Sequence, residues 1–171
     1  KLVAVSHDMV AHRIAARSST LRRPSDVRQL CTIGAGTAYG FLHRLAVLGN
    51  GGVVVASPAP ERTPACIDRH RVSHLAMAPF ALQRLLNVLP PGSVPPPSLR
   101  QIEIGGAILN GHLYEIARQR LCENIVSQYG ATEAGPVAGA TLRSLQGHPG
   151  AVGYVYSGVE VQAVDVDDNP L

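Results

Sequence analysis

The stretch QIEIGGAILNGHLYEIARQRLCENIVSQYGATEAG, residues 101–135, decides the fold because two short apolar runs flank one helical pattern. The runs at 101–104 and 125–128 have the length and composition of strands, and 113–123 has helical periodicity. Strands joined through a helix form a βαβ unit, in which they run parallel. The stretch therefore predicts two parallel strands, each followed by a glycine-bearing loop.

The same alternation extends toward the N-terminus, as far as Gln29. It predicts further strands at 30–33, 53–56 and 74–78 and helices at 39–48, 62–71 and 80–89. The run GVVVAS at 52–57 is apolar without alternation, which is typical of a parallel strand covered on both faces. The sequence thus predicts an α/β fold with a mostly parallel sheet flanked by helices.

The flanking segments have a different character. Residues 2–19, LVAVSHDMVAHRIAARSS, predict a strand that leads into a helix capped by Ser6, and we assign residues 1–28 to a neighbouring layer. The proline-rich residues 90–98 are expected to be a surface loop within an α/β unit spanning 29–135. From 136 to 171, glycine-punctuated alternation predicts a connection and then the start of an antiparallel β subdomain.

Composition excludes several classes of protein. With 46% hydrophobic and 16% charged residues the chain is not disordered. No apolar run reaches the roughly 18 to 20 residues of a membrane span, so we expect a cytoplasmic protein. All but one of its 15 basic residues are arginines, and their scatter argues against nucleic-acid binding. The three separated cysteines suggest neither a disulfide framework nor a zinc site.

Ligands of open parallel sheets bind beyond the carboxyl ends of the strands, where three loops stand out. GAGTAYG at 34–40 is either a phosphate loop or a plain turn, and the lack of an acidic residue about 20 positions later favours the turn. GGAIL at 105–109 could admit a flat ring against its backbone or pack the next helix closely. In YGATEAG at 129–135, an aromatic ring, a hydroxyl and a carboxylate suit a base, a phosphate and magnesium. The last two loops together favour a nucleotide site.

These segments resemble successive motifs of the adenylate-forming (AMP-binding) superfamily, which includes acyl-CoA synthetases, aryl-CoA ligases, luciferases and the adenylation domains of peptide synthetases. The resemblance rests on four segments: IDRHRVSHLAMAPFALQRLL (67–86), LRQIEIGGAILNGHL (99–113), NIVSQYGATEAGPVA (124–138) and GHPGAVGYVYSGVEVQAVDVDDNPL (147–171). It covers most of the chain. It implies the central fragment of the large N-terminal domain, with a flavodoxin-like or Rossmann-like subdomain.

The resemblance also implies roles for individual residues. Adenine is expected to lie between the ring of Tyr129 and the backbone of three residues, with Gln128 beside its edge. The cofactor-binding set is Gly105, Gly106, Ala107, Gln128, Tyr129 and Gly130. Thr132 is expected to contact the α-phosphate and Glu133 to help hold magnesium. Tyr39 and Ala131 are expected to line the acyl pocket.

The implied reaction joins a carboxylic acid to ATP as an acyl adenylate, with release of pyrophosphate, and then passes the acyl group to a thiol such as coenzyme A. Two alternatives stay open: an adenylation domain that loads a carrier protein, and a non-catalytic nucleotide-binding module. Thr37 stands where many acyl-CoA synthetases have a histidine.

The resemblance places Lys1 at the end of a phosphate loop, and the ribose-binding acid and catalytic lysine beyond Leu171. We therefore expect the chain alone to be inactive, and we expect apolar surface on its sheet to permit self-association.

Overall fold

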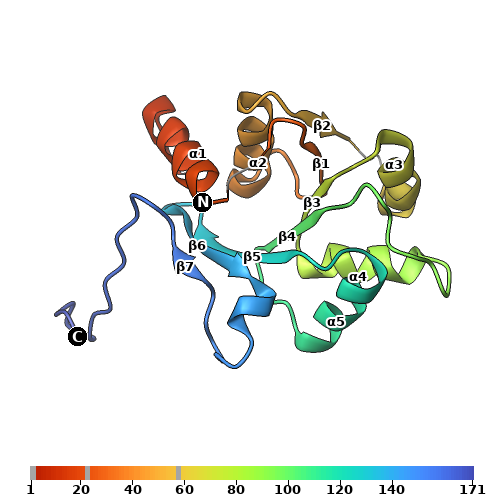
Figure 1. Cartoon of the computed structure of the whole chain (residues 1–171). Helices are drawn as coiled ribbons and strands as arrows, with labels where there is room; N and C mark the ends of the chain where they lie inside the picture. The colour runs from red at the N-terminus through yellow and green to blue at the C-terminus, as the bar shows by residue number, and fades with distance from the viewer. Residues whose placement is uncertain (1–2, 22–23, 57–58) are drawn as a thin grey trace.

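The computed structural model describes residues 3–21, 24–56 and 59–171, and in this part of the chain seven strands form one sheet (Figure 1). The strand order is β2-β1-β3-β4-β5-β6-β7. The first five strands are parallel, and β6 and β7 are antiparallel to their neighbours. The bounds are β1 Arg28–Cys31, β2 Val53–Val55, β3 His74–Met77, β4 Gln101–Gly105, β5 Ile125–Ala131, β6 Gly135–Thr141 and β7 Tyr154–Val155. The predicted α/β class is confirmed.

Helices cover both faces of the sheet. The α-helices are α1 His7–Leu21, α2 Ala38–Gly49, α3 Thr63–His70, α4 Pro79–Val88 and α5 Gly111–Arg120, with short 3₁₀ turns at Pro60–Arg62 and Leu142–Leu145. Figure 1 shows α1 beside α2 on one side of the sheet, and α4 beside α5 on the other. None of the helices in the described ranges is long and apolar enough to cross a membrane.

The main core lies on the face that α3, α4 and α5 cover. Leu75, Ile102 and Ile125 are in register across β3, β4 and β5, and they are at most 1% exposed. Leucines of α4 and α5 pack on them, including Leu82 and Leu113. This side of the sheet is apolar, as strands buried beneath helices require.

The opposite face carries buried polar side chains. Gln29 of β1, Glu103 of β4 and Gln128 of β5 are only 1%, 0% and 9% exposed. Glu103, for example, sits between Ile102 and Ile104 of the main core, because side chains alternate between the two faces. Helices α1 and α2 cover this face, so its polar groups need partners inside the protein.

Of the two elements predicted at the N-terminus, the helix is confirmed and the strand is not. The predicted helix begins at His7, and the Ser6 hydroxyl oxygen accepts a hydrogen bond from the Met9 N–H at 3.1 Å, as a cap does. The predicted strand before it is wrong for residues 3–6, which pair with no strand of the sheet. A strand needs a hydrogen-bonded neighbour, and residues 3–6 lead straight into α1. Lys1 lies outside the described residues.

The prediction that GVVVAS is covered on both faces is wrong. β2 is a three-residue strand at the edge of the sheet, and Val53 is 42% exposed. An apolar run of this length does not distinguish an edge strand from a central one. Position 57 of that run lies outside the described residues.

The stretch YGATEAG is not a free loop. β5 extends to Ala131, and residues 132–134 turn the chain into β6, which pairs antiparallel with β5. The sequence places the end of this strand at 128 because the strand-like apolar pattern ends there. A second antiparallel partner extends the pairing beyond it, and the register shifts between Tyr129 and Gly130. The predicted antiparallel β structure after residue 135 begins as β6 and β7 of the same sheet.

Candidate active site

The two glycine-bearing strand ends lie side by side. β4 and β5 are neighbours in the sheet, and Gly105 is in register with Gln128. Directly after β4, Gly106 has a φ of +86°, a conformation that favours glycine, and a Cβ there would meet nothing within 4 Å. The backbone beyond β4 is therefore bare and open to a ligand, beside the side chain of Tyr129.

A cleft of about 770 Å³ lies between these strand ends, α5 and residues 142–152. Five of the residues predicted to bind the nucleotide line it: Gly106, Ala107, Gln128, Tyr129 and Gly130. The Tyr129 ring is 53% exposed, so its face is available for stacking. The cleft is within the range of small-molecule sites, roughly 300 to 1,000 Å³, and its exposed ring and bare backbone fit an adenine.

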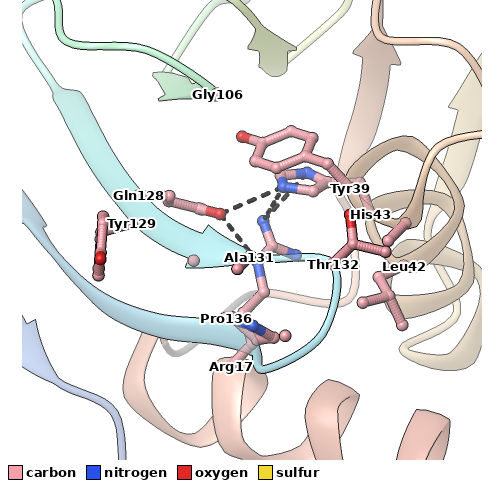
Figure 2. Close-up of a pocket in the computed structure, with 13 residues that line it drawn as sticks. Arg17, Tyr39, Leu42, His43, Gly106, Gln128, Tyr129, Ala131, Thr132 and Pro136 are labelled. Carbon is pink, nitrogen blue, oxygen red and sulfur yellow. Dashed lines mark hydrogen bonds between the residues drawn. The ribbon is translucent and has the colours of Figure 1, made fainter. Parts of the chain in front are cut away.

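A second, smaller pocket of about 190 Å³ lies on the side of α1 and α2 (Figure 2). Tyr39 and Ala131, the two predicted acyl-pocket residues, both line it, together with Thr132. The smaller pocket shares Gly106, Gln128, Tyr129 and Gly130 with the cleft. The end of β5 thus borders two adjoining spaces. Gly105 and Glu133 do not line either of them.

Tyr39 fills the space beside Gly105. A Cβ on Gly105 would lie 2.4 Å from a carbon of the Tyr39 ring, so a glycine is required there for the ring to lie against β4. The same ring stacks on His43, with 4.0 Å between the ring centroids. Burial, and next to it the charge of Glu103, holds the pKa of Tyr39 well above its ordinary value, so its hydroxyl stays protonated at neutral pH and can donate a hydrogen bond.

The GAGTAYG segment shapes the start of α2. The Thr37 hydroxyl oxygen accepts from the Gly40 N–H at 3.0 Å, and the hydroxyl donates to the Gly34 carbonyl at 2.8 Å. A Cβ on Gly40 would lie 2.2 Å from that carbonyl oxygen, so the turn leaves no room for a side chain at position 40. Thr37 therefore caps the helix that carries Tyr39 and His43.

A buried polar network forms the inner wall of the smaller pocket. Arg17 of α1 forms an ion pair with Glu103, and its Nε donates to Gln128 Oε1 at 3.3 Å. Arg17 Nη2 also lies 3.0 Å from His43 Nδ1 (Figure 2). Gln128 in turn donates to Glu103, and its Oε1 lies 3.2 Å from His43 Nε2.

Sequence reasoning missed three members of this network: Arg17, His43 and Glu103. The sequence does contain one indication of the network. A single glutamine or glutamate occurs within each of the short strand segments QLC, IEI and VSQY. Which helices cover those polar residues depends on packing between segments 26 to 111 residues apart.

Arg13, also on α1, holds the turn between β5 and β6. Its guanidinium donates to the Glu133 carbonyl at 2.6 Å and to the Thr132 carbonyl at 3.3 Å.

The Glu133 side chain is exposed at this turn. Magnesium in nucleotide sites is commonly bound by one or two carboxylates together with phosphate oxygens, so one exposed carboxylate fits. In residues 3–21, 24–56 and 59–171, no cluster of three His, Cys, Asp or Glu side chains forms a metal site without a nucleotide.

The fold of this chain is also found in solved structures of other proteins. The fold is similar to the N-terminal domain of FACL13 from Mycobacterium tuberculosis, at 18% identity and a TM-score of 0.90 over 99% of this chain and 44% of that one. Amide bond synthetase McbA from Marinactinospora thermotolerans is 29% identical, with a TM-score of 0.79 over 95% of this chain and 34% of that one. O-succinylbenzoate coenzyme A synthetase from Bacillus subtilis, solved in complex with AMP, is 19% identical, with a TM-score of 0.77 over 95% and 33% of the two chains.

The chain thus spans less than half the length of these solved structures. No curated protein sequence matches the chain. The family model described as AMP-binding enzyme matches residues 1–171, and the chain therefore belongs to the family of adenylate-forming, AMP-binding enzymes.

Proposed function

We propose that this chain supplies the adenine and acyl sites of an ATP-dependent acid ligase that forms an acyl adenylate and transfers the acyl group to coenzyme A. The observation that carries the proposal is the pairing of β4 with β5. It sets the bare backbone at Gly106 beside the exposed ring of Tyr129, with a cleft on one side and a small pocket on the other.

In the proposed reaction a carboxylate oxygen attacks the α-phosphorus of ATP. The bond from that phosphorus to the oxygen bridging to the β-phosphate breaks, and pyrophosphate leaves. The thiol of coenzyme A then loses its proton to solvent, and its sulfur forms a bond to the acyl carbonyl carbon. The bond from that carbon to the phosphate oxygen breaks, which releases AMP.

The side chains of this region act by binding and orientation. Tyr129 stacks on adenine opposite the backbone at Gly105, Gly106 and Ala107, while Gln128 and Gly130 border the ring. Thr132 lines the smaller pocket, close to the residues that border both spaces, and donates its hydroxyl to the α-phosphate. Holding acid and phosphate in adjoining pockets makes the attack effectively unimolecular.

Glu133 would hold magnesium, which would supply positive charge to neutralise the phosphates. The hydrogen bonds from Arg13 to the Thr132 and Glu133 carbonyls hold both residues on one turn. The turn lies directly after the pocket-lining Ala131, so Glu133 would hold the metal at the same end of β5 as the smaller pocket.

The test is carboxylate-dependent pyrophosphate release by the full-length ligase. We expect Glu133→Gln to lower kcat by about a hundredfold or more, since a group that neutralises charge in the transition state is lost. Glu123→Gln is the matched control, because Glu123 is exposed in the segment after α5 and lines neither space. ATP binding without any carboxylate-dependent pyrophosphate release would instead identify a non-catalytic nucleotide-binding module.

The acceptor is tested in the same assay. Formation of acyl-CoA on addition of coenzyme A is the expected result. Acylation only of a phosphopantetheinyl carrier protein would show that the ligase loads a carrier.

A further inference from the structure

The smaller pocket has the size of one ring. A cavity of about 150 Å³ lined by apolar side chains holds a benzene molecule. At about 190 Å³, the pocket therefore has room for one aromatic ring and about one or two further non-hydrogen atoms. Ala38, Leu42 and Pro136 give it apolar walls.

The inner wall does not open into a channel. It consists of Arg17 and His43, which are 3% and 2% exposed, and of Gln128, all joined to Glu103 in one network. A long alkyl chain would have to push between an ion pair and its hydrogen-bonded neighbours. Separating such a pair inside a protein is strongly unfavourable, so the network limits the depth of the pocket.

Two donors on the wall lack protein acceptors. Within the described residues, the Tyr39 hydroxyl and Arg17 Nη1 are buried and have no hydrogen-bond partner. Figure 2 shows the Tyr39 hydroxyl on the side of Gly106, above the network. Water can satisfy such groups in the free protein. A ligand that displaces this water has to offer an acceptor, or the donor stays unsatisfied.

The charge on the wall argues for an uncharged acceptor. The positive charge of Arg17 is already matched by the carboxylate of Glu103. A carboxylate on the part of the ligand inside this pocket would bring an extra negative charge into the same buried region. The described residues that line the pocket include no lysine and no arginine besides Arg17.

We propose that this pocket selects a compact acid of about one aromatic ring, bearing an uncharged hydrogen-bond acceptor that the Tyr39 hydroxyl binds, and rejects long-chain fatty acids. This inference rests on the proposed function, because it assigns the pocket to the acyl part of the acid.

The test compares acids with the full-length ligase. We expect the best of the three monohydroxybenzoates to exceed benzoate and terephthalate in kcat/KM for pyrophosphate release by about tenfold, the effect of one neutral hydrogen bond. Palmitate should be at least about a hundredfold poorer, since it exceeds the pocket. Tyr39→Phe should bring the ratio of hydroxybenzoate to benzoate close to one. Tyr154→Phe, which removes a hydroxyl from a tyrosine that is 70% exposed, should leave that ratio unchanged.

Calorimetric binding of the same acids without ATP separates this proposal from the proposed function. Palmitate as the best substrate, or an unchanged ratio in Tyr39→Phe, overturns the pocket assignment while leaving the ligase activity in place. If no acid releases pyrophosphate but a hydroxybenzoate binds in a Tyr39-dependent way, the proposed function fails and the pocket assignment stands. If no compact acid binds at all, the pocket assignment fails.

Discussion

Replacing Arg17 by methionine tests whether the buried network holds the site together. Glu103 is fully buried, and Arg17 is its ion-pair partner. Removal of one partner of a buried pair costs about 3 to 5 kcal/mol. The side-chain amides of Gln101 and Gln128 still donate to Glu103, so we expect the lower end, about 3 kcal/mol. With a urea m-value of about 2 kcal/mol/M, the unfolding midpoint of the chain should fall by about 1.5 M.

The matched control is Arg84→Met, because Arg84 and Glu61 form an exposed pair of the same residue types, with side chains 46% and 59% exposed. We expect that change to cost less than about 1 kcal/mol. The double variant Arg17→Met with Glu103→Leu should regain most of the lost stability, since an apolar pair replaces the ionic one. The reasoning is refuted if Arg17→Met costs no more than Arg84→Met, or if the double variant is no more stable than Arg17→Met.

Three further outcomes follow from the same region and its neighbours. Gly105→Ala should displace the Tyr39 ring and lower the melting temperature by several degrees, because a Cβ would lie 2.4 Å from that ring. Because its pKa is raised, Tyr39 holds its proton more tightly in the folded state than in the unfolded state. Its contribution to the free energy of unfolding is therefore fully present below about pH 10 and is lost as pH rises further. Urea unfolding should show the stability difference from Tyr39→Phe changing only above that pH. Burial raises the thiol pKa of Cys31 and Cys122, so both should react with a disulfide reagent only after the half-buried Cys66.

The strand and helix order was predictable because each element carries its own local signal. The runs around 74–77 and 101–105 are short, apolar and separated by helical periodicity, and the observed bounds of β3 and β4 differ from the predicted ones by one residue at one end. Successive parallel strands of this kind are usually neighbours in the sheet, and β4 and β5 are successive. For this reason the proximity of GGAIL and the strand end that carries Tyr129 could be predicted before the structure.

The covering of the polar face could not be predicted in the same way. Glu103 between two isoleucines fits a strand with one solvent-exposed face equally well. Its burial depends on α1, whose Arg17 lies 86 positions earlier in the chain. Likewise, β5 continues to Ala131 because β6 pairs with it, and the residues from Tyr129 onward have no apolar pattern of their own.

Of the three β5 residues that border both spaces, only Gln128 also belongs to the buried polar network. Gln128 borders both the cleft and the smaller pocket, and Arg17, His43 and Glu103 fix its side chain. The register shift follows directly, between Tyr129 and Gly130, and irregularities of this kind redirect side chains at strand ends. Because the network that limits the smaller pocket also orients Gln128 beside the cleft, a change in the network has to alter both spaces. We therefore expect variants of Arg17 to change the apparent affinity for ATP together with the preference among acids.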